Sequence, residues 1–263
     1  MRPKYFSTGN ERHLFRAAHK RNLPVMVKGP TGCGKTRFVE AMAEELGRPL
    51  VTVACNEDLT AADLVGRYLL HDGQTQWVDG PLTRAVRTGA ICYLDEIVEA
   101  RQDTTVVIHP LTDHRRLLVI DRTGEVIVPV EGFQLVVSYN PGYQSVLKDL
   151  KESTRQRMVA ISFDYPNEEM EKEIIRSETA IDEKSARYLV AIGRAIRRVD
   201  APGLKEVAST RTLVTAAHLC TAGISLYEAA TAAIAEPLTD DKALNVALTE
   251  LIAANTIDGA LHH

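Results

Sequence analysis

Gly29-Pro30-Thr31-Gly32-Cys33-Gly34-Lys35-Thr36 matches the pattern G-x-x-x-x-G-K-[ST] at every fixed position. The apolar run before it, residues 23–28, predicts a buried strand, and the periodic run after it, residues 36–46, predicts a helix that Gly47 ends. Three glycines allow a tight turn whose N–H groups point at phosphate oxygens, next to the partial positive charge of a helix N-terminus. The stretch therefore predicts a site for the phosphates of a nucleotide, with Lys35 on the β- and γ-phosphates and the Thr36 hydroxyl on Mg²⁺.

The composition limits the classes of protein to which the chain can belong. It has 263 residues, enough for one large or two small domains, and 45% of them are hydrophobic. The net charge of −4 gives no support to nucleic acid as the main partner, and no apolar run approaches the roughly 20 residues that span a bilayer. Four cysteines stand far apart, without a C-x-x-C pair, which is typical of a reducing compartment. We therefore expect a cytoplasmic protein that has neither a membrane nor nucleic acid as its partner.

The order of patterns predicts an α/β domain followed by a helical one. Apolar runs alternate with helical patterns and are typical of strands buried on both faces of a parallel sheet, at residues 25–28, 50–54, 90–94 and 135–139. After Tyr165 and Pro166 the patterns are helical, at residues 168–177, 183–199, 211–222, 226–235 and 240–254. We expect an α/β nucleotide-binding domain over residues 1–165 and a small all-helical domain over residues 166–263.

Two segments interrupt the alternation of strands and helices. Residues 66–80 place β-forming residues on both sides of Asp72-Gly73, and residues 116–130 do so around Thr123-Gly124. We expect two β-hairpins inserted into the α/β domain. Between the second strand and the first hairpin, Thr60 and Asp63 have the spacing of a capping box, which predicts the start of a short helix.

Two carboxylates, Asp95 and Glu96, follow the third apolar strand. Asp95 offers Mg²⁺ a hard oxygen ligand, directly or through water, and Glu96 is placed to act as the general base that polarises the attacking water. An acidic strand end without a function is common when such a pattern stands alone. Here a phosphate loop in the same chain already requires a metal ligand and a base. The two residues therefore predict the hydrolytic part of the site.

Four further polar residues are candidates for the same site. Asn140 follows the fourth strand, at the sheet edge where α/β proteins bind ligands, and could orient the water or contact the γ-phosphate; a turn-forming Asn is the alternative. Arg155 and Arg157 could neutralise charge on the transferred phosphoryl group, in their own subunit or in a neighbour, or could form a solvated basic face. Arg211 stands in the first turn of a predicted helix, where a cation opposes the helix dipole unless a polyphosphate is near.

In this order the motifs resemble those of AAA+ ATPases, and more narrowly those of the MoxR branch. Lys35 matches the Walker A lysine, Asp95 and Glu96 match Walker B, Asn140 matches sensor 1 and Arg211 matches sensor 2. The chain is similar to the CbbQ/NirQ/NorQ family, and most to its CbbQ type, over residues 28–40, 64–70, 79–82, 93–96, 103–116 and 138–144. The resemblance implies a P-loop AAA+ core, with a parallel sheet between helices and two hairpin inserts, and a C-terminal all-helical lid.

Further properties are implied by this resemblance alone. It implies ATP and Mg²⁺ as cofactors, a ring-shaped homo-hexamer and an arginine finger that a neighbouring subunit supplies. The finger position matches Arg157, but Met158 stands where the family often has Phe, so Arg155 stays an alternative. The family works with a partner protein whose von Willebrand factor A domain carries a metal-ion-dependent adhesion site. The implied client is Rubisco for the CbbQ type and nitric oxide reductase for the NorQ/NirQ type.

Two functions of other classes would use the same loop. A monomeric P-loop kinase needs the loop and the metal carboxylate, but neither the two hairpins nor Arg157. A nucleotide-gated switch with little turnover needs no base, a role that Glu96 is placed to fill. The sequence therefore favours a Mg-ATP-dependent remodelling ATPase over both.

Overall fold

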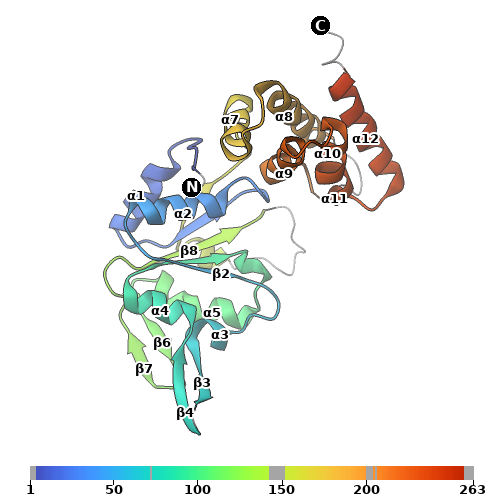
Figure 1. The fold of residues 1–263 in the computed structure, drawn as a ribbon. Coiled ribbons are helices and arrows are strands. Elements are labelled where there is room, and N and C mark those ends of the chain that lie inside the picture. Colours follow the sequence, from blue (N-terminus) through green and yellow to red (C-terminus); the bar gives the residue numbers. More distant parts are fainter. Residues whose placement is uncertain (1–3, 72, 142–151, 200–203, 205, 258–263) are drawn as a thin grey trace. The chain divides into compact units, whose positions relative to one another are not determined.

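The computed structural model describes residues 4–71, 73–141, 152–199, 204 and 206–257 (Figure 1). The chain forms two compact units. The α/β unit holds residues 7–29 and 35–163, and the helical unit holds residues 4–6, 30–34 and the described part of the chain from residue 164 onward. Residues 30–34 of the phosphate loop thus group with the helical unit, while Gly29 and Lys35 belong to the α/β unit.

A five-stranded parallel sheet is the centre of the α/β unit. Its strands lie in the order β2-β5-β8-β1-β9, and all four neighbouring pairs are parallel. They are β1 (Val25–Lys28), β2 (Leu50–Ala54), β5 (Ile91–Asp95), β8 (Gln134–Tyr139) and β9 (Val159–Ser162). The central strands β5, β8 and β1 are buried along nearly their whole length, as parallel strands between helices are. The predicted parallel sheet is confirmed, and β9 is a strand that the patterns did not predict.

Helices cover both faces of this sheet (Figure 1). On one face lie α1 (Glu11–Lys20) and α2 (Lys35–Glu45), and the Phe38 ring packs between Phe15 and Phe163, with ring centroids 5.4 and 5.0 Å away. On the other face lie α3 (Ala61–Val65), α4 (Pro81–Thr88) and α5 (Gln102–Thr112). The capping box at the start of α3 is confirmed, because Thr60 and Asp63 each accept a hydrogen bond from the other's backbone N–H.

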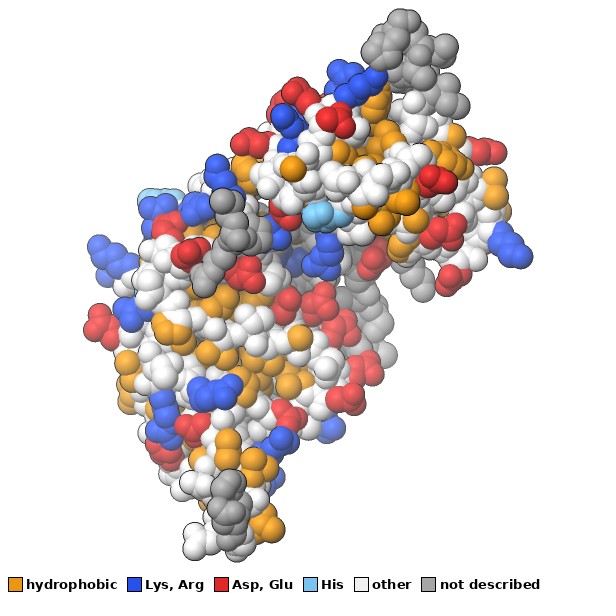
Figure 2. Space-filling view, in the orientation of Figure 1, with side chains coloured by type: hydrophobic (Ala, Val, Ile, Leu, Met, Phe, Trp, Pro, Cys, Tyr) orange, Lys and Arg blue, Asp and Glu red, His pale blue; other side chains and the backbone are white. Residues whose placement is uncertain are grey.

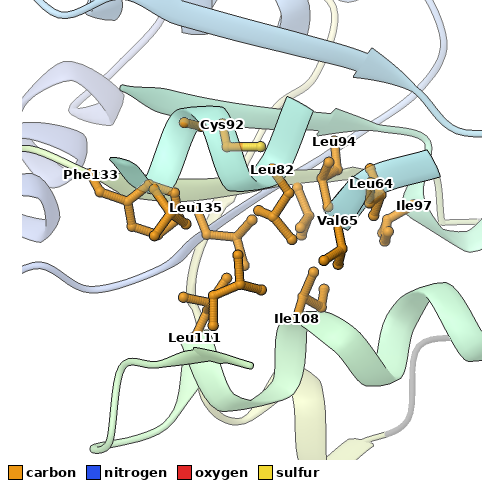
Figure 3. Packing of buried hydrophobic residues seen from close by; sticks show 14 of the residues in the cluster. Leu64, Val65, Leu82, Cys92, Leu94, Ile97, Ile108, Leu111, Phe133 and Leu135 are labelled. Atoms are coloured by element: carbon orange, nitrogen blue, oxygen red, sulfur yellow. The ribbon is translucent and has the colours of Figure 1, made fainter. Parts of the chain in front are cut away.

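The main hydrophobic core fills the space between the sheet and α3, α4 and α5. Figure 3 shows Leu64 of α3, Leu82 of α4 and Ile108 of α5 meeting Leu94 of β5 and Leu135 of β8. None of these five side chains is more than 2% exposed. Burial of such side chains stabilises a fold by roughly 1.5–3 kcal/mol each. A closely packed core therefore supports the carboxyl ends of β5 and β8.

The two predicted hairpins are present in the α/β unit. One pairs β3 (Gly66–His71) with β4 (Gln74–Asp79), and the other pairs β6 (Leu118–Ile120) with β7 (Glu125–Ile127). Arg87 of α4 bridges them, with its guanidinium 2.8 Å from the Asp79 carboxylate and 2.6 Å from that of Glu125. Figure 2 shows hydrophobic side chains on the surface around the far end of the first hairpin, where Leu70 is 77% exposed.

The helical unit contains α7 to α12, and its C-terminal helices are confirmed. They are α7 (Glu168–Thr179), α8 (Glu183–Arg197), α9 (Thr210–Thr221), α10 (Leu226–Ala230), α11 (Glu236–Leu238) and α12 (Lys242–Ile257), with a π-helical turn at Thr231–Ala235. Four of the helices begin at a residue whose side chain accepts a backbone N–H, namely Asn167, Asp182, Ser209 and Ser225. Throughout the described ranges, every helix is too short or too polar to span a bilayer.

Candidate nucleotide site

Polar side chains gather where β1, β5 and β8 end. The three strands are adjacent and parallel, so Gly29, Asp95 and Asn140 all lie at one edge of the sheet. The Gly29 N–H continues the ladder by donating to the carbonyl of Tyr139 over 3.1 Å. A Cβ at Gly29 would stand 2.4 Å from the Phe163 carbonyl oxygen, so only glycine lets the chain turn here. The sheet therefore brings the start of the phosphate loop beside the predicted metal and water residues.

Lys35 brings a positive charge to this edge. Its side chain is almost wholly buried, at 7% exposure, and its ammonium donates to the Gly29 carbonyl over 2.8 Å. Lys35 is also the first residue of α2, so the ammonium adds its charge to the positive end of the helix. A phosphate could take the place of that carbonyl as a stronger, charged acceptor.

The Asp95 carboxylate is the centre of a hydrogen-bonded cluster. Its Oδ1 accepts from the Tyr93 hydroxyl over 2.6 Å and from the Ser138 hydroxyl over 2.5 Å. Its Oδ2 accepts from the Thr36 hydroxyl of α2 over 3.4 Å. Burial above all, followed by the nearby Asp95 charge, raises the pKa of Tyr93, so its hydroxyl stays protonated and acts as a donor. The cluster fixes both carboxylate oxygens of Asp95.

These residues fit the metal and the phosphates that the motif implies. Mg²⁺ prefers oxygen ligands and is commonly held by one or two carboxylates together with phosphate oxygens and water. Thr36 and Asp95 present such oxygens within 3.4 Å of each other. When bound, Mg²⁺ would neutralise charge on the β- and γ-phosphates. We therefore keep Thr36 and Asp95 as the residues that would hold it.

Glu96 adopts an unusual backbone conformation. Its φ of 56° and ψ of 48° lie in the left-handed region, which costs a non-glycine residue free energy and is often found at functional sites. Its N–H donates to the Ser138 hydroxyl over 2.6 Å, while that hydroxyl donates to Asp95. Ser138 is fully buried in β8 and thus holds Asp95 and Glu96 in their relative positions. The sequence reasoning missed Ser138, although a hydroxyl inside an apolar strand two residues before Asn140 was a usable signal.

Asn140 contacts the predicted base. Its side-chain N–H donates to Oε1 of the Glu96 carboxylate over 3.1 Å. Its own Oδ1 is buried and has no hydrogen-bond partner among the residues that the structure describes. A buried acceptor without a partner is costly, by about 1–3 kcal/mol, and a bound water or ligand would satisfy it. The pair can thus hold a water between an amide oxygen and a carboxylate.

Negative charge at this edge also affects a neighbouring thiol. Cys55 follows β2, and burial, then the charges of Asp95 and Glu96, raise the pKa of its thiol to about 12. Cys55 therefore stays neutral at physiological pH and is not a nucleophile.

The helical unit places Arg211 beside the middle of the phosphate loop. A Cβ at Gly32, whose φ is +69°, would lie 2.6 Å from Cβ of Ser209 and 3.4 Å from Cβ of Arg211. Ser209 caps α9 by accepting from the N–H of Thr212 over 3.2 Å, and Arg211 is exposed in the first turn. Two neighbouring loop residues are fixed as well, because Cys33 is buried and the Thr31 carbonyl accepts from the Tyr165 hydroxyl over 3.0 Å. Pro30 and Gly34 are half-buried.

The two candidate arginines differ in their surroundings, since Arg155 is the last residue of α6 (Glu152–Arg155) and Arg157 follows that helix. Arg155 is half-buried, whereas Arg157 is exposed and makes no side-chain hydrogen bond or ion pair with any residue that the structure describes. Between α5 and α6, the buried Thr154 hydroxyl lies 2.8 Å from Nε2 of His109 and anchors the segment that carries them. Arg157 is thus the more exposed of the pair.

Two family models match the chain, one before and one after residue 165. An AAA domain (dynein-related subfamily) matches residues 24–158, and a CbbQ/NirQ/NorQ C-terminal region matches residues 171–255. The chain belongs to the CbbQ/NirQ/NorQ family. It is therefore an AAA ATPase, which binds a nucleotide and hydrolyses ATP.

Relatives of this family support the assignment, and a solved structure shares the fold. Protein CbbQ of Hydrogenophilus thermoluteolus is 57% identical and covers 94% of this chain and 92% of its own length. Protein NorQ of Paracoccus denitrificans is 58% identical and covers 96% and 93%. The solved structure of a RuvB mutant from Thermotoga maritima covers 93% of this chain and 71% of that one with a TM-score of 0.54, and at 15% identity it shows the fold alone.

Replacing Glu96 by Gln tests its role as the base. Glu96→Gln keeps the hydrogen-bonding shape but cannot accept a proton, so we expect ATP binding to be retained and turnover to fall by at least about 100-fold. Single-turnover hydrolysis and nucleotide titration measure the two quantities separately. Turnover close to that of the unaltered protein would show that another group acts as the base.

Replacing Ser138 by Ala tests its role in holding the two carboxylates. Ser138→Ala removes a donor to Asp95 and leaves the Glu96 N–H without its acceptor, so we expect kcat to fall about 10-fold or more while ATP affinity changes little. Ser162→Ala, an exposed serine in the strand β9 of the same sheet, is the matched control. Equal kcat values for the two variants would show that Ser138 does not hold the two carboxylates in a way that matters for turnover.

Proposed function

We propose that the chain is a Mg-ATP-dependent protein-remodelling ATPase that works as a ring-shaped homo-hexamer. The observation that carries this proposal is the exposed Arg157, which lies just before β9 of the site's own sheet and makes no side-chain hydrogen bond or ion pair with the described part of the chain. An arginine that neutralises phosphoryl charge can be supplied from another molecule. A site that is completed only by a neighbouring subunit couples hydrolysis to assembly.

The residues at the sheet edge divide the chemistry among them. Lys35 would hold the β- and γ-phosphates, while Thr36 and Asp95 would hold the metal. Glu96 would take the proton of the attacking water, which Asn140 Oδ1 would keep in place. In this scheme the Arg157 guanidinium of the next subunit stabilises charge on the phosphoryl oxygens.

The hairpins support the remodelling role. The β3–β4 hairpin exposes Tyr68, Leu69 and Leu70 by 46, 41 and 77%, and the β6–β7 hairpin exposes the cross-strand pair Val119 and Val126. Exposed apolar groups on projecting hairpins suit contact with another protein. Membership of an ATPase family is evidence against the kinase and the non-hydrolysing switch.

The client and partner are proposed from the family resemblance. We propose Rubisco as the client and a von Willebrand factor A domain protein with a metal-ion-dependent adhesion site as the partner, because residues 28–40 and 103–116 resemble the CbbQ type. Identities of 57% to a CbbQ and 58% to a NorQ do not separate the types. Maturation of nitric oxide reductase is therefore the alternative function, and it is tested together with reactivation of Rubisco.

ATPase activity per subunit should rise with protein concentration, because each site needs an arginine from its neighbour. Arg157→Ala should abolish this activity, by about 1000-fold or more, while sedimentation shows the assembly retained. Arg84→Ala, an exposed arginine of α4, is the matched control and should behave like the unaltered protein. A flat concentration profile would contradict the ring, and loss of activity in Arg155→Ala alone would move the finger to Arg155.

The client should respond only when the ATPase is active. We expect the chain, with its partner and Mg-ATP, to restore carboxylation by Rubisco that a sugar phosphate has inhibited, and we expect Glu96→Gln to restore none. The same preparation is added to immature nitric oxide reductase. Recovery of nitric oxide reductase alone would reassign the client, and recovery of neither would contradict both client proposals.

A further inference from the structure

Arg197, the last residue of α8, uses three parts of its guanidinium to hold the helical unit together. Its Nη1 and Nη2 donate to the two oxygens of Glu171 on α7 over 2.8 and 2.7 Å. Its Nε donates to the carbonyl of Ala208, just before α9, over 2.6 Å. A guanidinium suits this task because its donors lie in one rigid plane. One side chain thus joins α7, α8 and the approach to α9.

Glu171 is the buried partner of this arrangement. It is 0% exposed, and besides Arg197 it accepts a hydrogen bond from the Thr210 hydroxyl over 2.6 Å. Thr210 is the first residue of α9 and precedes Arg211. The hydration that its two charges lose offsets much of the Coulomb energy of a buried ion pair. A contribution to stability therefore does not by itself explain why the pair is there. What the pair does supply is one defined position for the start of α9.

Tyr165 extends the cluster to the phosphate loop. The Arg197 guanidinium carbon lies 3.9 Å from the centre of the Tyr165 ring, and the Tyr165 hydroxyl donates to the Thr31 carbonyl over 3.0 Å. A second path runs directly from loop to helix, since Gly32 leaves no room for a Cβ against Ser209. The middle of the loop and the first turn of α9 are therefore held in one arrangement.

We propose that Tyr165, Arg197 and Glu171 are positioning residues of the ATPase, which set the Thr31 peptide and Arg211 in register for the phosphates of ATP. None of the three needs to touch ATP. The proposal rests on the assignment of Arg211 as a phosphate contact. It adds that this contact is built by side chains that no nucleotide-binding motif contains, and that it depends on the conformation of the loop at Thr31.

The mildest test is Tyr165→Phe, which removes one hydroxyl and keeps the ring beneath Arg197. Loss of a single hydrogen bond predicts a rise in KM for ATP of about 2- to 10-fold, with little change in kcat or in Tm. Tyr188→Phe, in a tyrosine of α8, is the matched control. A KM equal to that of the control would overturn the role of Tyr165.

Arginine exchange tests the ion pair in the same way. Arg197→Lys keeps the charge but loses the paired donors, so we expect a larger rise in KM than for Tyr165→Phe. Arg194→Lys changes a more exposed arginine on the same helix, 3.8 Å from Glu168 of α7, and should leave KM unchanged. Equal KM values for the two lysine variants in folded protein would overturn the role of Arg197.

A double-mutant cycle separates this proposal from the assignment on which it rests. If Tyr165 acts through the position of Arg211, the rise in KM of Tyr165→Phe with Arg211→Ala should be clearly smaller than the product of the single effects. If the rise in KM of the double variant equals the product of the two single effects, the proposal is overturned, while Arg211 stays a phosphate contact. If Arg211→Ala alone leaves KM unchanged, the assignment of Arg211 fails, and the proposal fails with it.

Discussion

The candidate hydrolytic site depends on the hydrogen bonds that the Asp95 carboxylate accepts. It accepts hydrogen bonds from Thr36 on α2, Tyr93 on β5 and Ser138 on β8, so one helix and two neighbouring strands meet at two oxygen atoms. The same Ser138 hydroxyl accepts from the N–H of Glu96 and so supports the left-handed backbone of this predicted base. The packed core beneath β5 and β8 supports this arrangement.

The sequence predicted the parts of the molecule that short patterns encode. The apolar runs at β1 and β2 match the observed strands residue for residue, and Asp-Gly and Thr-Gly marked both hairpins. It did not predict β9, which lies at the sheet's edge and alternates in burial along Val159–Ser162, whereas the equally short β1 is buried along nearly its whole length. Short edge strands are set by their neighbours, and here β1 supplies the pairing for both β8 and β9.

The candidate site divides along the same line. Lys35, Thr36, Asp95 and Glu96 belong to contiguous motifs, so their chemistry could be inferred from residue type and spacing. Tyr165, Glu171 and Arg197 make contacts between residues far apart in the chain, such as the one between Tyr165 and Thr31. No local pattern predicts a contact of that kind, because it exists only once the helices have packed.

We propose that one subunit does not contain a complete hydrolytic site. Mixing two inactive variants, Glu96→Gln and Arg157→Ala, tests it most directly. In a ring, an Arg157→Ala subunit keeps its own base and can receive Arg157 from a Glu96→Gln neighbour. We expect an equal mixture to regain ATPase activity at about a quarter of its interfaces, as random assembly of a heterologous ring gives. A mixture as inactive as each variant alone, although hybrid rings form, would contradict the claim.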